Sequence, residues 1–140
     1  EEAETVLRRA LAIRVEKLPP RQVDTAVAQA DLAQALSARG KFEEARTLAA
    51  DALSIREEKL PAGHWTRFEA QSLLGEALAG QGKLAEAEAL LLPAYDGLRK
   101  SAAASPWRKK AARQRIVRLY EAWGRPEEAA AWRAKETAPF

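Results

Sequence analysis

Large apolar residues recur along this chain at the spacing of one helix face. Pairs separated by four positions include Leu32 and Leu36, Leu74 and Leu78, and Ile116 and Tyr120. Residues three or four positions apart share a face of an α-helix, whereas a half-buried strand shows strict alternation. Alanine, leucine, glutamate and arginine dominate the composition, and these residues are good helix formers. The pattern therefore predicts an all-α protein.

The chain also repeats itself every 42 residues. The tripeptides GKF, GKL and GRP begin at Gly40, Gly82 and Gly124, with a spacing of 42 both times. At the same offset, 12 of the 20 residues of segment 1–20 are identical in segment 43–62. A fixed period in this range is typical of stacked repeats, in which each unit buries its apolar face against its neighbours.

Each period contains two helical segments. We expect A helices at 24–39, 66–81 and 106–123, and B helices at 1–17, 43–59, 85–100 and 127–136. A glycine follows each A helix, where a left-handed residue commonly ends a helix. Proline closes two B helices at Pro19 and Pro61, since it cannot continue a helix. Ser105 before Pro106 predicts an N-cap followed by a first helical residue.

These elements predict one domain, an antiparallel helix-pair solenoid over 1–140. It would consist of an orphan B helix at 1–20 and repeats at 21–62, 63–104 and 105–140. The small side chains of Ala45 and Ala87 would let paired helices cross closely. The residues expected to be buried are Leu32, Leu36, Leu48, Leu74, Leu78, Leu90, Ile116 and Trp132.

Segments 32–53 and 73–94 resemble the tetratricopeptide repeat. The small residues of that family's pattern fall on Ala33, Ala45, Ala52, Gly75, Ala87 and Ala94. The usual period is about 34 residues, and a period of 42 is similar to the kinesin-light-chain subtype. The resemblance implies a right-handed superhelix with His64 in an inter-repeat loop. Segment 115–135 also resembles the last repeat of long bacterial proteins, including serine/threonine kinases with C-terminal repeats.

Few residues of the chain could support catalysis. Cysteine is absent and His64 is the only histidine, so a catalytic triad or a zinc site lacks its partners. No glycine-rich phosphate loop occurs either. We therefore expect a protein that is not an enzyme and needs no cofactor or metal. No apolar run approaches the roughly 20 residues of a membrane span, and we expect a cytoplasmic location without membrane contact.

The resemblance implies that the A helices line a groove in which ligand peptides lie, so we expect a protein–protein interaction scaffold. Its groove positions fall on Val27, Ala30, Gln34, Ser37, Glu69, Ser72, Glu76, Ala79, Ala111, Gln114, Arg118 and Glu121. The candidate contacts are Gln34, Ser72, Glu76, Gln114 and Arg118. Family members that grip peptide backbones often use groove asparagines, and this chain has none. Glu76 and Arg118 share a register, so they could equally pair with each other.

A basic run is the other candidate surface. Segment 99–118 contains eight basic residues and no acidic one, and it adds Arg108, Lys109 and Arg115 to the candidates. A solvated helix face is the simplest interpretation. A docking surface for an acidic protein segment is the sharper hypothesis, and a nucleic-acid-binding helical repeat is the alternative. The net charge is only +3 and no aromatic residues are interleaved for base stacking, so nucleic acid is unlikely.

Three tryptophans and the first helix complete the candidates. Trp65 and Trp107 share a register in the inter-repeat loops and are expected to pin the next A helix. Trp123 replaces polar residues of the other copies, so it is either a contact anchor or a cover for the end of the stack. The stripe formed by Val6, Leu7, Ala10 and Leu11 lacks an A helix. Self-association there, or packing of upstream sequence, is expected. Methionine is absent, which suggests a piece of a longer chain.

Overall fold

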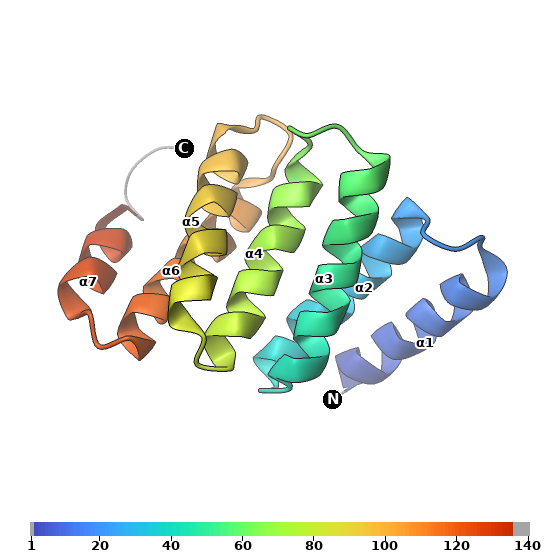
Figure 1. Ribbon diagram of the computed structural model, residues 1–140, viewed down its shortest axis with the longest axis horizontal. Helices are drawn as coiled ribbons and strands as arrows, with labels where there is room; N and C mark the ends of the chain where they lie inside the picture. Colours follow the sequence, from blue (N-terminus) through green and yellow to red (C-terminus); the bar gives the residue numbers. More distant parts are fainter. Residues whose placement is uncertain (1, 136–140) are drawn as a thin grey trace.

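A computed structural model describes residues 2–135 and shows seven α-helices in a row (Figure 1). They are α1 (Glu2–Lys17), α2 (Val23–Ala38), α3 (Phe42–Lys59), α4 (Trp65–Gly80), α5 (Leu84–Lys100), α6 (Pro106–Ala122) and α7 (Pro126–Ala134). The part of the chain that the structure describes contains no strand. The all-α prediction is confirmed. The expected helix ends that lie within the described residues are within two residues of the observed ones, whereas the expected start at residue 1 and the expected end at residue 136 lie outside the described residues.

A glycine in the left-handed region ends each A helix. Gly40, Gly82 and Gly124 have φ angles of 79°, 80° and 72°. The residue after each glycine donates its N–H back to the last turn; Lys41, for example, bonds to the carbonyl of Leu36 at 2.9 Å. This backbone arrangement satisfies carbonyls that would otherwise be orphaned at the helix end. The repeated glycine therefore specifies the tight turn between each A helix and its B helix.

The N-termini of α4 and α6 have different caps. His64 is the N-cap of α4, and its Nδ1 accepts a hydrogen bond from the Thr66 N–H at 3.3 Å. Its structural role is therefore visible in the fold. Ser105 is the N-cap of α6 and Pro106 begins the helix, as predicted. The Ser105 hydroxyl is buried and makes no capping hydrogen bond among the described residues, so the fixed φ of Pro106 is the main local signal for that helix start.

Consecutive helices form three A–B pairs, α2 with α3, α4 with α5, and α6 with α7. The A helices also contact each other, α2 with α4 and α4 with α6, and so form one continuous layer. The orphan helix α1 packs against α2 and has no A helix of its own within the described residues. From α2 onward each described helix thus belongs to an A–B pair, whereas α1 has no such partner among the described residues.

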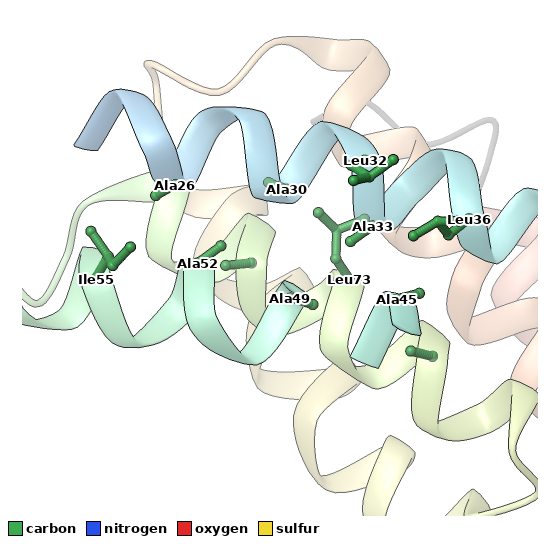
Figure 2. Packing of buried hydrophobic residues seen from close by; sticks show 12 residues of the cluster. Ala26, Ala30, Leu32, Ala33, Leu36, Ala45, Ala49, Ala52, Ile55 and Leu73 are labelled. Atoms are coloured by element: carbon green, nitrogen blue, oxygen red, sulfur yellow. The ribbon is translucent and has the colours of Figure 1, made fainter. Parts of the chain in front are cut away.

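The core around the first pair is built largely from alanine, and Figure 2 shows the side chains of α2 and α3 together with Leu73 of α4. We call this set the alanine cluster: Ala26, Ala30, Leu32, Ala33, Leu36, Ala45, Ala49, Ala52, Ile55, Ala70, Leu73 and Ala77. Ala45, Ala49 and Ala52 on α3 are fully buried, at 0% exposure. Side chains this small allow the helix backbones to approach closely, as the sequence pattern predicted for Ala45.

The rest of the core contains larger side chains, and we call it the aromatic cluster. It consists of Leu78, Ala87, Leu91, Tyr95, Leu98, Ala104, Ala112, Ile116, Val117, Leu119, Tyr120 and Ala129, with Trp65, Phe68, Trp123 and Trp132 packed against it. Glycines make room for these side chains. A Cβ on Gly75 would lie 2.7 Å from the Leu91 side chain, and one on Gly97 would lie 2.5 Å from the Phe68 ring. Glycine at these two positions therefore fits the helices together.

The expected core residues divide into two groups. Leu32, Leu36, Leu78 and Ile116 are buried as predicted. The prediction of full burial is wrong for the others, which pack on the clusters but are only partly buried: Leu48, Leu74, Leu90 and Trp132. They lie at the margins of the two clusters, where solvent still reaches one side of each side chain.

The apolar stripe of α1 is only partly as expected. Val6 is 61% exposed as predicted, and Ile13, which was not predicted, is 51% exposed. The prediction is wrong for Leu7 and Leu11, which pack against the alanine cluster and are partly buried. These leucines lie on the side of α1 that packs against α2, the A helix of the next repeat.

Candidate functional site

A groove of about 600 Å³ runs across the layer of A helices. Residues of α2, α4 and α6 line it, together with Phe42 at the start of α3: Gln34, Ser37, Ala38, Phe42, Glu76, Ala79, Gly80, Ala111, Gln114, Arg115, Arg118, Leu119 and Ala122. Two registers of the 42-residue repeat supply a residue from all three A helices. One is Gln34, Glu76 and Arg118, and the other, one helical turn later, is Ala38, Gly80 and Ala122.

Small residues keep the groove open. Besides the alanine–glycine–alanine register, Ala79 and Ala111 line the wall. The ring of Phe42 lies so close to Gly80 that a Cβ there would be 2.2 Å from it. Phe42 and Gly80 were not among the predicted site residues. The sequence signal that could have indicated them is the set of small residues at positions 38, 80 and 122. These positions lie one helical turn after Gln34, Glu76 and Arg118.

An ion-paired network lies along one side of the groove. Arg118 donates to the Glu76 carboxylate at 2.7 Å, and Arg115 Nε lies 3.5 Å from the same carboxylate. Arg115 also donates to the Ser72 hydroxyl at 3.1 Å. Burial lowers the pKa of Arg115, and the charge of Glu76 opposes that shift. The pairing of Glu76 with Arg118 that their shared register suggested is therefore present. Arg115 lies against the same carboxylate and also donates to Ser72.

The residues of this network differ in accessibility. Ser72 is fully buried and Arg115 is 6% exposed, so neither offers much surface to a partner. The Arg118 side chain is 57% exposed, whereas Glu76 is 18% exposed. Two guanidinium groups face one carboxylate here, which leaves an excess of one positive charge at the groove. Arg118 is thus the residue of this network that can meet a ligand directly.

Two exposed amides complete the polar lining. Gln34 and Gln114 stand on α2 and α6, and neither side chain has a hydrogen-bond partner within residues 2–135. An amide offers two donor hydrogens and an acceptor oxygen, the groups needed to pair with a peptide backbone. Glutamine can thus serve in a groove that has no asparagine.

Arg108 and Lys109, predicted to belong to a basic docking surface, lie outside the groove lining. The Arg108 guanidinium lies 4.7 Å from the ring centre of Trp65 and 4.4 Å from that of Trp107, and it donates to Glu69 at 2.6 Å. Lys109 is 9% exposed. The run of basic residues is therefore not one solvated face, because several of its members are buried or already ion-paired.

The basic residue that the sequence pattern missed is Arg56 on α3. It is 2% exposed and donates to the backbone carbonyl of Thr66 at 2.9 Å, with Glu69 at 3.4 Å. Desolvation lowers its pKa, and Glu69 opposes the shift. Arg56 occupies the register of buried Leu98 in the next repeat, which is the sequence signal that could have indicated burial.

The tryptophans have separate roles. Trp65 packs against the aromatic cluster as expected for a residue that pins α4. Trp107 is 57% exposed, so the expectation that it pins α6 is wrong; its ring instead covers Arg108. Trp123 also packs on the aromatic cluster, stacked with Tyr120 and covered by Arg125 at 3.8 Å. These contacts are compatible with either role expected for Trp123, and both remain predictions.

The described residues contain no group of three histidine, cysteine or acidic side chains that could hold a metal ion. None of the helices in that range has the length and apolar character required to cross a membrane.

Comparison with known proteins places the repeats in a family. Two tetratricopeptide repeat models match the chain, one over residues 1–58 and the other over residues 69–93, together more than half of it. The chain belongs to the tetratricopeptide repeat family. No curated protein gives a significant match.

Two solved tetratricopeptide structures are similar to this chain. One is described as the nearly identical TPR-like repeats of a kinesin light chain from Podosopora anserina; it is 25% identical, with a TM-score of 0.73 over 99% of this chain and 68% of that chain. A second structure of that protein, with a substitution, is 27% identical, with a TM-score of 0.72 over 94% of this chain and 62% of that one. This chain spans about two thirds of their length.

These similarities confirm the tetratricopeptide array of the kinesin-light-chain kind and the helical-repeat solenoid. Arrays of this family generally mediate protein–protein interaction. The bacterial and kinase context remains a prediction.

Proposed function

We propose that this tetratricopeptide array binds a peptide segment of a partner protein in the groove across α2, α4 and α6. The observation that carries the proposal is the groove itself, about 600 Å³, lined by small residues and by the free amides of Gln34 and Gln114. Binding clefts combine such a concave surface with a few well-placed polar groups. The amides would pair with the peptide backbone, and the space over Ala79, Gly80 and Ala122 would hold its side chains.

Arg118 sets the preferred charge of that peptide. Its exposed guanidinium is only partly neutralised by Glu76, which also faces Arg115. An acidic side chain on the partner would form a charge-assisted hydrogen bond with Arg118 and balance the excess positive charge. We therefore propose the groove, rather than the whole basic run, as the docking surface for an acidic segment.

Selection from a random peptide display library on the immobilised domain tests this proposal. Isothermal titration of a selected peptide should then give 1:1 binding. Ala79→Arg places a long side chain in the groove and should abolish that binding. Arg118→Glu should lower the affinity for an acidic peptide by about tenfold. Ala89→Arg adds the same charge at an exposed residue of α5 and is the matched control. Equal loss in the control, or no effect of Ala79→Arg, would contradict groove binding.

The same titrations separate a protein partner from nucleic acid. A single-stranded oligonucleotide should bind at least a hundredfold more weakly than the selected peptide at physiological salt, because Arg108, Arg115 and Lys109 are buried or ion-paired. Both ligands would lose affinity as salt rises, so the comparison is made at a single ionic strength. Tight oligonucleotide binding that Arg118→Glu removes would overturn the peptide proposal.

A further inference from the structure

The Glu76 carboxylate lies where two arginines of the groove converge. Arg118 donates to Glu76 Oε2 at 2.7 Å, and Arg115 Nε lies 3.5 Å from the same oxygen. Glu76 stands on α4 and both arginines stand on α6, so this contact joins two neighbouring A helices. All three residues line the groove. The Glu76 side chain thus takes the place that an acidic group of a bound peptide would have beside these arginines.

The two arginines differ in how much they depend on Glu76. Arg115 is 6% exposed, and the Ser72 hydroxyl to which it donates is neutral. A buried charge is costly unless an opposite charge lies close by, and Glu76 supplies that charge. The Arg118 side chain is 57% exposed and keeps its contact with water. Arg118 can therefore exchange Glu76 for another carboxylate, whereas Arg115 needs an anion beside it.

The internal repeat contains the neutral counterpart of Glu76. Its position 42 residues earlier, on α2, is Gln34, which lines the same groove. Glutamine and glutamate have the same shape, and they differ in charge and in hydrogen-bonding groups. An A helix of this array therefore accommodates glutamine at this register, so Glu76→Gln removes the charge with little change in shape.

We propose that Glu76 competes within the protein for the basic site that an acidic peptide would use, and so limits the affinity of the groove for acidic segments. The inference rests on the peptide binding proposed for the groove. An incoming carboxylate has to share Arg118 with Glu76 or displace it, and the charge of Glu76 repels it. Peptide groups that pair only with the amides of Gln34 and Gln114 do not meet this competition.

Titration of Glu76→Gln tests the competition. The probes are a library-selected peptide that contains acidic residues and an analogue in which these residues are replaced by their amides. The acidic peptide should bind the variant about five- to tenfold more tightly than the wild type, and the analogue should change by less than about twofold. In an Arg118→Gln background the gain should fall below about twofold. Glu57→Gln removes the same charge from an exposed position of α3 and should leave both affinities unchanged.

Urea unfolding gives a second readout, and its first part needs no peptide. Free Glu76→Gln should have a lower urea midpoint than the wild type, because buried Arg115 loses the carboxylate beside it. A saturating amount of the acidic peptide should raise the midpoint of the variant more than that of the wild type, since a tighter ligand stabilises the folded state more.

The outcomes separate this inference from the proposed function. Weaker binding of the acidic peptide by Glu76→Gln would show that Glu76 orients Arg118 for the ligand, and it would overturn the competition. Unchanged affinity, or an equal gain for the amide analogue, would overturn it as well, as would selections that yield no acidic peptide on either protein. If Ala79→Arg leaves peptide binding intact, the groove is not the binding site and the proposed function itself fails.

Discussion

The alanine cluster and the aromatic cluster pack neighbouring helices against each other with different sets of side chains. Around α2 and α3, alanine is the commonest residue of the buried cluster, with larger side chains such as Leu32, Leu36 and Ile55 among the alanines. Around α4 to α7, the cluster contains leucine, tyrosine and tryptophan, and glycine at positions 75 and 97 provides room for the side chains of Leu91 and Phe68.

The comparison shows which feature of the helix crossing the two pairs have in common. Each A–B crossing needs a small residue on one helix, but it can stand on either partner. In the first pair, fully buried Ala49 on α3 meets the alanines of α2. In the second pair, the counterpart of Ala49 is Leu91, and Gly75 on α4 accepts it. The glycine on α4 therefore makes room for the larger side chain on α5.

The largest expected effect comes from removing volume in the aromatic cluster. Leu91→Ala should lower the free energy of unfolding by about 2–5 kcal/mol, because Leu91 is fully buried and Gly75 cannot fill the cavity. Urea denaturation followed by circular dichroism measures the change. Val15→Ala, at an exposed position of α1, is the control and should be nearly neutral. A loss under 1 kcal/mol would mean that the Leu91 side chain does not fill the space where α4 and α5 cross.

Adding volume should be the next largest effect. Ala45→Leu and Ala87→Leu should each cost about 1–3 kcal/mol through overpacking, since both residues are at 0% exposure. Ala45→Leu should cost at least as much, because the alanine cluster has few long side chains that could move aside. Ala89→Leu on the exposed side of α5 should change stability by less than about 0.5 kcal/mol. An unchanged melting curve for Ala87→Leu would refute the repeat register.

A double-mutant cycle sharpens the exchange of volume. Gly75→Ala alone should destabilise by about 1 kcal/mol, because its Cβ would meet the Leu91 side chain at 2.7 Å. In the Leu91→Ala background the same substitution should be neutral or stabilising, since the clash is gone and alanine favours a helix. The coupling energy should thus reach about 1 kcal/mol or more. Additive effects would show that Gly75 and Leu91 do not share the space.

The smallest expected effect concerns pH at the open end of the stack. The pKa of Glu4 lies below its ordinary value of 4.5 because hydrogen bonds from Lys41 and Arg8 hold the carboxylate, and Arg8 lowers the pKa of Glu44 likewise. Depressed carboxyl pKa values contribute stability that is present above the unfolded value near 4.5 and is lost as the pH falls through the folded values.

Hydrogen exchange measured by NMR should therefore show α1 losing protection before α4 and α5 as the pH is lowered below about 4.5. Arg8→Gln together with Lys41→Gln should remove most of this pH dependence. If α1 and α5 lose protection together, these ion pairs do not hold α1 to its neighbours.

Much of the fold could be predicted from the sequence because the helix-pair pattern occurs there three times. The glycines at 40, 82 and 124 and the leucine spacing fixed the helices to within two residues. The groove positions of Gln34, Glu76, Gln114 and Arg118 also followed from the repeat register and the family resemblance. Repetition supplied the independent evidence that a single helix pattern lacks.

The partners of the charged residues could not be predicted. Arg115 and Arg118 are three residues apart on one helix, yet the first is buried on Ser72 and the second is exposed. Register says which face a residue occupies, but burial depends on which side chain the neighbouring helix presents. Leu7 and Leu11 were misassigned for a related reason: the spacing of the apolar residues does not show which of them the neighbouring helix α2 covers.

Photo-crosslinking tests the central claim, peptide binding in the A-helix groove, most directly. A benzophenone amino acid is placed at Gln114 in the groove and, in a second protein, at exposed Ala89 on α5, and each is irradiated with a library-selected peptide. The account predicts a covalent peptide adduct from position 114, lost when unlabelled peptide is in excess, and none from position 89. Crosslinking from position 89 with none from position 114 would contradict it.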